Sequence, residues 1–395
     1  MFKQTFFQLL AKLVTSLSTF FILSIIASKY SQEGLGVFTL SFSYLGLFMI
    51  VSDFGFNGHL LKQMQNNSGE EIFRKLLGVR ILWALVLVVL SIILLPFFAF
   101  TGEQFLIVSI AGSLSIVGIA IFTTTNLIFQ KNLRYDLSAI ATILGTIVYL
   151  LLVLFFSQKA YPLVYISIAA MLGWIGICFF SILFAKLLIK NILPIFDLKF
   201  ARSLFKETWP IATTLLLNLV YFRVDAFLIA YFRNLSEVGI YNLAYQFFQA
   251  ALVLPIFIMN GYYPFLLKSY SGLKAAIVVL ISVSVIGTLL TFIFSPILIT
   301  TLAGVSFEGS VVSLKILSLG FPAFFLSALF MWILVAEGRY KLLLKFYTSA
   351  LILNLILNIL YVPLYSFVAA SIITVLCEYW VLLLQLISLR KILIK

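Results

Sequence analysis

The chain has 395 residues, of which 63% are hydrophobic and 10% are charged. In a soluble globular domain about a quarter of the residues are charged, so this composition excludes that class and predicts an integral membrane protein. The formal net charge of +13 could suggest a nucleic-acid partner, but the Lys and Arg residues are spread along the chain, between and at the ends of apolar stretches.

Long apolar stretches recur from one end of the chain to the other. A membrane-spanning helix needs roughly 20 mostly apolar residues, because the hydrocarbon layer is about 30 Å thick. Twelve stretches meet this requirement: residues 6–28, 34–57, 76–98, 105–130, 135–157, 163–186, 207–231, 238–262, 275–300, 311–335, 342–362 and 366–388. They are too continuously apolar for the alternating strands of a membrane barrel. The sequence therefore predicts an all-α polytopic protein with 12 transmembrane helices.

The positions of the basic residues predict the orientation. Most of the 26 Lys and Arg residues fall in the loops that face the cytoplasm if both termini do so. Cytoplasmic loops of membrane proteins carry such an excess of basic residues. We therefore expect a multi-pass protein of the bacterial cytoplasmic (inner) membrane with both termini inside and no nucleic-acid partner.

The sequence contains a weak internal repeat. When residues 25–40 are aligned with residues 228–243, Ile26, Ala27, Gly36 and Leu40 match Ile229, Ala230, Gly239 and Leu243. Each window covers the turn between the first and second helices of a six-helix half, an arrangement typical of transporters. We therefore expect one bundle over residues 1–190, a cytoplasmic linker over 191–206 that is partly an amphipathic helix on the inner leaflet, and a second bundle over 207–395.

Two charges lie within the seventh predicted span. On a helix, Asp225 shares a narrow stripe with Thr214, Asn218 and Tyr221, whereas Arg223 points nearly the opposite way. The two charges are therefore not expected to pair with each other. Because charges at membrane depth are costly, each should either serve transport or be neutralised by another helix. Both readings stay open for both residues.

Further polar residues lie within the predicted spans of the second half. Glu378 lies near the middle of the last span, and either a functional or a structural role is open to it. The amides are expected mainly to hydrogen-bond between helices. They are Asn242, Gln246 and Gln249 on one face of the eighth span and Asn354 and Asn358 on one face of the eleventh.

Three cations, Lys12, Arg80 and Lys315, lie one to two turns inside their spans. They could anchor helices at the interface or give a cavity a positive lining. The sequence lacks the glycine-rich Lys-Ser/Thr loop of ATP-binding proteins, and its single histidine, His59, makes a His-rich metal site implausible. We therefore expect no cofactor, no metal and no enzymatic activity.

Four segments carry a resemblance to a known family. They are YFRVDAFLIAYFRNLSEVGIYNLAYQF, EGLGVFTLSFSYLGLFMIVSDFGFN, LAGVSFEGSVVSLKILSLG and AEGRYKLLLKFYTSALILNLILNILYVPLYSFVAASIITVLCEYW. Together they resemble the bacterial O-antigen and capsule polysaccharide flippases of the multidrug/oligosaccharidyl-lipid/polysaccharide exporter superfamily. Ser366 and Val368 stand where that family is expected to have glycines.

The resemblance implies two six-helix bundles forming a V around a central cavity. It implies a flippase that moves an undecaprenyl-pyrophosphate-linked oligosaccharide from the inner to the outer leaflet by alternating access, for lipopolysaccharide or other surface polysaccharide. The partners implied are this substrate, membrane lipid and polysaccharide assembly proteins. The family's Arg-x-Asp pattern falls on Arg223 and Asp225, and its cavity cations meet the pyrophosphate. The expected substrate-binding residues are Arg223, Asp225, Asn218, Lys315, Arg80, Lys12 and Glu378.

Three alternatives remain. A drug or cation antiporter of the same superfamily would depend on the carboxylates Asp225 and Glu378 rather than on cations. A major-facilitator transporter would have a Gly-x-x-x-Asp-Arg/Lys signature, which is missing from residues 58–75. A membrane polysaccharide polymerase or glycosyltransferase would need a large outer loop with catalytic residues, and the predicted topology has none.

Overall fold

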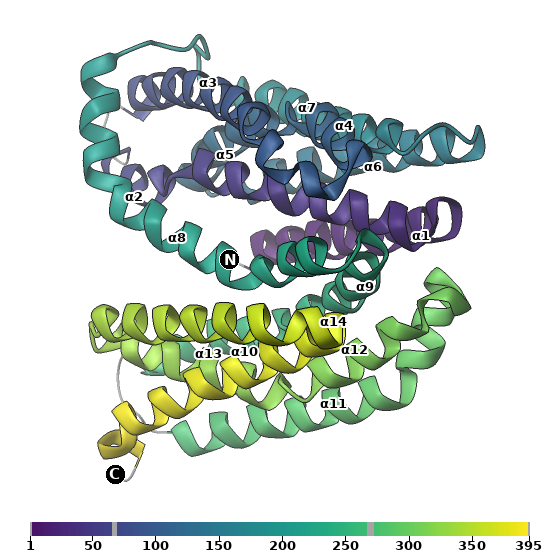
Figure 1. Cartoon of the computed structure of the whole chain (residues 1–395). Helices are drawn as coiled ribbons and strands as arrows, with labels where there is room; N and C mark the ends of the chain where they lie inside the picture. Colours follow the sequence, from purple (N-terminus) through teal and green to yellow (C-terminus); the bar gives the residue numbers. More distant parts are fainter. Residues whose placement is uncertain (1, 65–68, 267–271, 394–395) are drawn as a thin grey trace. The chain divides into compact units, whose positions relative to one another are not determined.

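The computed structural model describes residues 2–64, 69–266 and 272–393, and these residues form helices and no strands (Figure 1). The chain divides into two compact units. Unit 1 comprises Met1–Tyr30 and Val37–Val220, and unit 2 comprises Ser31–Gly36 and Tyr221–Lys395. The boundary thus lies within one long helix, and a short segment of the first half belongs to unit 2.

Unit 1 is a bundle in which α7 packs against α4, α5 and α6. A Cβ atom on Gly145 of α6 would lie 2.9 Å from the Gly173 carbonyl oxygen of α7, and one on Gly173 would lie 2.6 Å from the Tyr149 Cβ. Small residues allow such close approach of membrane helices. The elements are α1 (Phe2–Asp53), α2 (Phe56–Gln63), α3 (Gly69–Ile93), the 3₁₀ helix η1 (Leu95–Thr101), α4 (Glu103–Gly112), α5 (Ser115–Lys131), α6 (Tyr135–Gln158), α7 (Val164–Ala185) and most of α8 (Leu198–Phe232).

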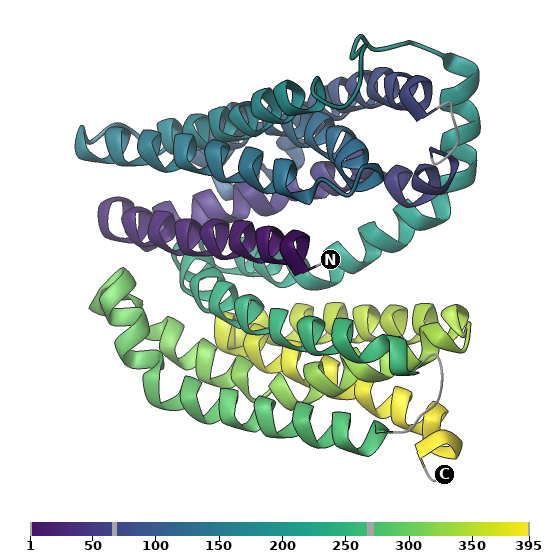
Figure 2. The same cartoon turned by 180° about the vertical axis from the view of Figure 1, so that it is seen from behind.

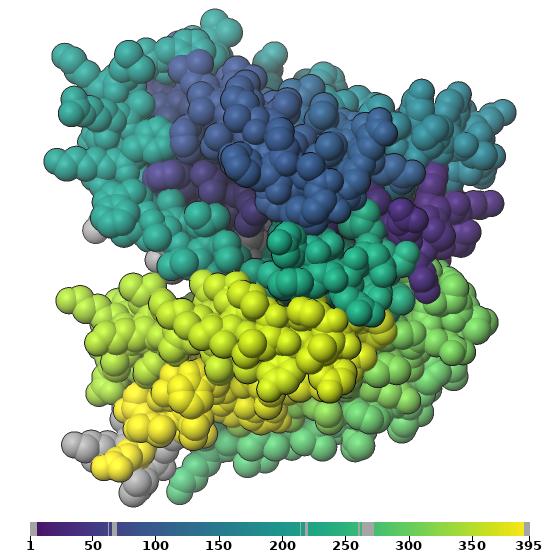
Figure 3. Space-filling view, in the orientation of Figure 1, coloured from purple at the N-terminus to yellow at the C-terminus, as the bar shows by residue number. Residues whose placement is uncertain are grey.

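Unit 2 is a second bundle, in which α12 packs against α9, α11 and α14, and α13 packs against α10, α11 and α14. Large apolar side chains of α11 and α14 are exposed at its surface, among them Ile293, Ile297, Leu360 and Ile387; Figure 3 shows α14 at this surface in yellow. Such a surface fits contact with lipid. The remaining elements are α9 (Leu235–Ala251), α10 (Val253–Leu266), α11 (Leu273–Ala303), the 3₁₀ helix η2 (Val305–Phe307), α12 (Glu308–Ser318), α13 (Phe321–Ala336) and α14 (Tyr340–Leu393).

Two of these helices are each broken near the middle. α1 has 52 residues and α14 has 54, so at about 1.5 Å per residue either would be far longer than a bilayer core if it were straight. α1 breaks at Ser31, with φ of 64°, and α14 breaks at Ser366, with φ of 52°. The chain reverses direction at each break (Figures 1 and 2).

By length and composition, eight helices of the described chain can cross a membrane, or up to ten if each of two bent pairs is one span. The prediction of a polytopic all-α membrane protein is therefore confirmed. Each of the two broken helices, α1 and α14, is counted as one helix in these totals, although each covers two predicted spans. The number of twelve spans stays a prediction.

At the break in α14, Ser366 stands where a glycine was expected, and side-chain contacts hold the turn. A positive φ is unfavourable for a residue with a Cβ atom, by about 1–2 kcal/mol. The Ser366 hydroxyl donates a hydrogen bond to the Glu237 carboxylate. Glu237 also pairs with Arg233 at 3.2 Å, and Arg233 donates to the Pro363 carbonyl oxygen at 3.3 Å. This polar cluster fixes the turn between the two segments of α14.

A reciprocal contact within unit 2 joins the two repeat windows. A Cβ atom on Gly36 would overlap the carbonyl oxygen of Leu235, and one on Gly239 would overlap the carbonyl oxygen of Gln32. Gly36 aligns with Gly239 in the internal repeat, and Gln32 aligns with Leu235 in the same register. The repeat therefore has a physical counterpart, in which equivalent glycines cross backbone to backbone. The Gln32 amide also donates to the Ser306 carbonyl oxygen.

The linker lies along the N-terminal part of α3. The Glu70 carboxylate accepts hydrogen bonds from the backbone N–H groups of Lys190 and Asn191 at 3.2 and 3.1 Å. The Ile195 N–H donates to the Arg74 carbonyl oxygen at 2.9 Å. Residues 191–197 are not helical, so the expected amphipathic helix can begin only with α8 at Leu198.

Asp197 forms the start of α8. Its carboxylate accepts a hydrogen bond from the Phe200 N–H at 2.9 Å and lies 3.2 Å from the Lys75 ammonium. The backbone hydrogen bond and the Lys75 charge both hold the pKa of this carboxyl below its usual range. The contact attaches the start of α8 to α3. The predicted bundle boundaries at 190 and 207 stay predictions.

Candidate functional site

Asp225 of α8 is buried in unit 2, with 2% of its surface exposed. The Tyr241 hydroxyl of α9 donates to its Oδ2 atom at 2.9 Å, and the Thr374 hydroxyl of α14 donates to the same atom at 2.7 Å. The Asn358 amide of α14 donates to Oδ1 at 2.9 Å. An ionised carboxylate is an acceptor only, so these donors fit the charged form.

The same site can also hold a protonated Asp225. The Thr374 hydroxyl carries one hydrogen atom, and it lies both 2.7 Å from Asp225 and 3.0 Å from the Ala370 carbonyl oxygen. When Asp225 is ionised, Thr374 can donate to it. When Asp225 is protonated, the acid can donate to Thr374, which then donates to Ala370. The geometry therefore accommodates both charge states without moving a helix.

Asn358 is held in turn by its own helix. One N–H of its Nδ2 atom points to Asp225, and the other is shared between the Asn354 carbonyl oxygen at 2.9 Å and the Asn354 Oδ1 atom at 3.0 Å. Its own Oδ1 atom is buried and has no hydrogen-bond partner among the described residues. The two amides, expected as glue between helices, thus orient one donor toward Asp225.

The stripe predicted around Asp225 is described only in part. The side chains of Thr214 and Asn218 lie outside the described residues. Tyr221 is buried in α8, and its hydroxyl lies beside the carboxyl of Glu378 in α14. Glu378 is 3% exposed and also lies beside the Ser327 hydroxyl of α13. Unit 2 therefore contains two buried carboxyl groups, Asp225 and Glu378, and no described salt bridge involves either one.

Arg223 faces a different neighbour from Asp225, as the helical periodicity predicts. It is half-buried, and its Nη2 atom donates to the Gln249 Oε1 atom of α9 at 3.3 Å. Its guanidinium carbon lies 5.8 Å from the centre of the Tyr245 ring, within the range of a cation–π contact. These partners are neutral, so Arg223 keeps its charge available for an anion.

Lys315 of α12 is half-buried, and its ammonium lies 5.9 Å from the centre of the Phe292 ring of α11. It makes no salt bridge with a described residue. Its contact is thus with an apolar ring of its own unit, and a role toward a substrate stays a prediction.

Arg80 of α3 has an anionic partner already. Its side chain is fully buried in unit 1, and its Nη2 atom lies 2.7 Å from the Asp53 Oδ1 atom of α1. Nη1 donates to the Thr124 hydroxyl at 3.3 Å, and the guanidinium carbon lies 5.4 Å from the Phe56 ring centre. This pairing favours a structural role over a place among the substrate-binding cations.

Replacing Asp53 by asparagine should therefore destabilise unit 1. The loss should be about 3 kcal/mol, the low end of the range for breaking a buried pair, because Arg80 stays buried while Asp53 is partly exposed. The double variant Asp53→Asn/Arg80→Met should recover most of the melting temperature of the purified protein. If the double variant is stable but exports no substrate, Arg80 has a transport role and the structural reading is wrong.

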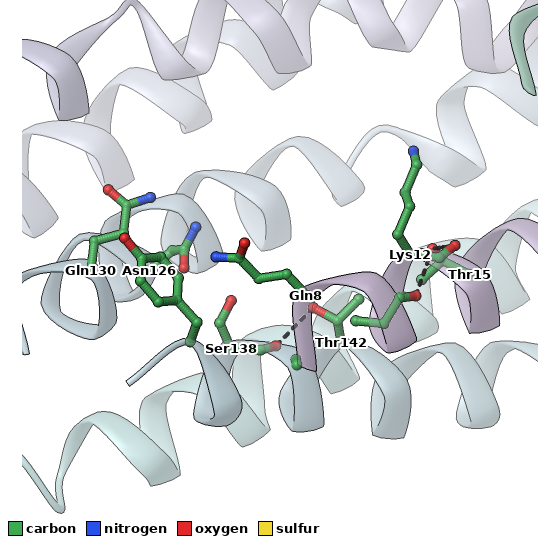
Figure 4. Close-up of a pocket in the computed structure, with 10 residues that line it drawn as sticks. Gln8, Lys12, Thr15, Asn126, Gln130, Ser138 and Thr142 are labelled. Atoms are coloured by element: carbon green, nitrogen blue, oxygen red, sulfur yellow. Dashed lines mark hydrogen bonds between the residues drawn. The ribbon is translucent and has the colours of Figure 1, made fainter. Parts of the chain in front are cut away.

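Lys12 lies at a polar pocket of unit 1, between α1, α5 and α6. The pocket has a volume of about 270 Å³. Figure 4 shows the Gln8 amide pointing toward Asn126 and Gln130, while Lys12 extends away from them. The residues that line the pocket are Gln8, Ala11, Lys12, Thr15, Asn126, Gln130, Tyr135, Ser138, Ala139 and Thr142.

The sequence signals found some of these groups and missed others. Asp225, Asn358 and Lys12 stand out as polar residues on apolar helices. Thr374 gives no such signal, because threonine in an apolar span usually bonds to its own backbone. In the described part of the chain, no group of three or more His, Cys, Asp or Glu side chains is arranged to hold a metal ion.

Comparison with known proteins adds a family and a fold. Residues 1–270 match the model of a family described as polysaccharide biosynthesis protein. No curated protein matches the chain. Among solved structures, the lipid II flippase MurJ in an inward closed conformation is 16% identical with a TM-score of 0.79, and the match covers 98% of this chain and 87% of MurJ.

Two further structures share the fold. An inward-facing MATE multidrug resistance transporter of the MOP superfamily is 12% identical with a TM-score of 0.74, over 95% of this chain and 94% of the transporter. A MOP superfamily transporter from Pyrococcus furiosus is 14% identical with a TM-score of 0.59, over 98% and 92%. At these identities the likeness to solved structures shows the fold alone. The match over residues 1–270 confirms the expected resemblance to a polysaccharide family.

Proposed function

Because the chain belongs to the polysaccharide biosynthesis protein family, we propose that it is a flippase for a lipid-linked oligosaccharide. It moves an undecaprenyl-pyrophosphate-linked glycan from the inner to the outer leaflet of the bacterial cytoplasmic membrane by alternating access. The match over residues 1–270 carries this proposal. The similarity in fold to a lipid II flippase supports it.

The proposed topology follows the distribution of basic residues. Both termini and the linker at 191–206 face the cytoplasm, and the two bundles cover residues 1–190 and 207–395. Polysaccharide assembly proteins that supply the glycan or lengthen it are the partners. The chain itself is a transporter rather than an enzyme.

We assign the coupling of transport to proton binding to Asp225. Its hydrogen bonds fit the charged form, and Thr374 can exchange acceptors to fit the neutral form. Arg223, whose described partners are neutral, is the cation of unit 2 that is best placed to meet a pyrophosphate. Proton binding at Asp225 and anion binding at Arg223 would then lie on one helix, α8.

A deletion strain tests the function directly. We expect cells without this protein to accumulate the lipid-linked oligosaccharide on the inner leaflet and to lose a surface polysaccharide, because the glycan is made but does not cross. Radiolabelled lipid extracts and surface glycan staining measure the two effects. Normal surface polysaccharide in a strain without a redundant exporter would refute the proposal.

A drug or cation antiporter is the second candidate, because Asp225 and Glu378 are buried carboxyl groups without a salt-bridge partner in the described chain. This candidate requires that the same deletion sensitise the cells to cationic dyes while the surface glycan stays intact. The two functions thus give opposite results in one strain.

A further inference from the structure

The pocket of unit 1 has a regular construction. Each of three helices contributes polar residues spaced four apart, which lie on one face of a helix. They are Gln8 and Lys12 on α1, Asn126 and Gln130 on α5, and Ser138 and Thr142 on α6. A stripe of this kind on one helix could serve packing. Three stripes that converge on one cavity form a binding surface, and Figure 4 shows the Gln8 amide of α1 pointing toward Asn126 and Gln130 of α5.

The lining selects against cations. It contains amides, hydroxyls and one ammonium, but no carboxylate. A positively charged drug would therefore meet Lys12 with no compensating charge. Amides offer both donors and acceptors, and they match the hydroxyl groups of a sugar, which also do both.

The hydrogen-bonding capacity of the pocket is partly unused. The Thr142 hydroxyl donates to the Ser138 carbonyl oxygen at 2.9 Å, so it is left only as an acceptor toward a ligand. The Asn126 Oδ1 atom is buried and has no hydrogen-bond partner among the described residues, so it is closed to the pocket in this conformation. A buried acceptor without a donor is costly, and rotation of the Asn126 amide would bring this acceptor to a ligand hydroxyl.

The volume limits the ligand. At about 270 Å³, the pocket is smaller than the roughly 300–1,000 Å³ of cavities that hold drug-sized molecules. One sugar ring fits this space, whereas an entire oligosaccharide does not. Lys12 extends away from the amides and forms no salt bridge with a described residue, so its charge is free for a phosphate beside the ring.

We propose that this pocket binds the sugar at the phosphate end of the lipid-linked glycan, with the amides on the ring and Lys12 on the phosphate. The proposal rests on the proposed function and adds the part of the substrate that unit 1 recognises. Any sugar 1-phosphate carries the same chemistry, so a soluble one can serve as a probe.

Glucose 1-phosphate, glucose, inorganic phosphate and tetraphenylphosphonium are the probes, and saturation-transfer NMR on the full chain in nanodiscs measures binding. We expect glucose 1-phosphate to bind more tightly than glucose or phosphate alone. The variant Asn126→Leu/Gln130→Leu should lower the affinity for glucose 1-phosphate at least tenfold. Gln158→Leu, an exposed amide at the far end of α6, is the matched control and should bind like the wild type.

A second variant covers the case in which the double substitution does not fold. Gln130→Glu adds a carboxylate to the lining. The affinity for glucose 1-phosphate should therefore fall by more than the affinity for glucose, because the added charge repels the phosphate. Equal weakening of both probes, wild-type affinity in Asn126→Leu/Gln130→Leu, or preferential binding of tetraphenylphosphonium at this pocket would each overturn the proposal.

The outcome is separable from that of the proposed function. Loss of surface polysaccharide in the deletion strain together with unchanged sugar-phosphate binding in the pocket variants would leave the flippase in place and refute only this pocket. Intact surface polysaccharide in the deletion strain would refute the function, whatever the pocket variants bind.

Discussion

Alanine at Gly239 should disrupt the contact between the two repeat windows, and valine should disrupt it more. A Cβ atom at this position would overlap the backbone carbonyl oxygen of Gln32, and backbone cannot rotate away as a flexible side chain can. Overpacking of this kind typically costs about 1–3 kcal/mol, and a backbone clash belongs at the upper end. We expect a lower melting temperature of the purified protein and less protein in the membrane.

The repeat supplies an equivalent test at the other side of the contact. Gly36→Ala should have an effect similar to Gly239→Ala, because its Cβ atom would overlap the Leu235 carbonyl oxygen. Gly46 is the control, since a Cβ atom there would meet nothing within 4 Å. Gly46→Ala should be neutral or stabilise by up to about 1 kcal/mol through helix propensity. If Gly239→Ala melts like Gly46→Ala, the close glycine crossing does not exist in the protein.

The helices could be predicted from the sequence because the hydropathy of each span depends only on its own residues. The prediction of a span at 135–157 agrees with α6 at Tyr135–Gln158, and that at 275–300 agrees with α11 at Leu273–Ala303. Breaks within spans leave no trace in hydropathy. The span predicted at 311–335 is divided between α12 and α13 near Gly320, and Pro322 stands in the first turn of α13. Proline is favoured at the start of a helix, so this break has a local sequence signal that hydropathy alone does not register.

At the candidate site too, the sequence shows properties of single helices but not the contacts between helices. The sequence shows that Asp225 is a charge in an apolar helix, and helical spacing shows that Arg223 faces away from it. It does not show that Thr374 and Tyr241 are the donors, because their positions depend on how α9 and α14 pack against α8. For Arg80, the sequence leaves interface anchoring and a cavity lining both open. Its partner Asp53 ends a different helix, and periodicity within one span says nothing about pairing between spans.

Asparagine at Asp225 is expected to reduce export strongly while leaving the fold intact. Asparagine keeps the size of the side chain, but it is neutral at every pH, so it cannot exchange a proton. Its new NH₂ group can be accommodated, because Asn358 has a buried Oδ1 atom with no partner in the described chain and Thr374 can turn its hydroxyl to donate to Ala370. The loss of stability should therefore stay within about 1–2 kcal/mol. We expect at least a tenfold loss of surface polysaccharide at wild-type expression.

Two further variants separate the charge of Asp225 from its structural role. Asp225→Ala removes the shared acceptor of Tyr241, Asn358 and Thr374. Asn358 and Thr374 keep acceptors in Asn354 and Ala370, and the Tyr241 hydroxyl keeps only the 3.2 Å contact with Thr374. The loss should be about 1–3 kcal/mol, the cost of a poorly satisfied buried group, so this variant should melt below Asp225→Asn. Thr374→Val keeps the charge but removes the hydroxyl that exchanges acceptors, so export should fall in part.

The decisive measurement is transport into proteoliposomes at several pH values. The wild-type rate should change with pH, and the Asp225→Asn rate should be low and independent of pH, because the titrating group is gone. If Asp225→Asn exports at the wild-type rate and with the wild-type pH profile, the carboxylate is a structural acceptor for three donors, and coupling must reside elsewhere, with Glu378 as the next buried carboxyl group to test.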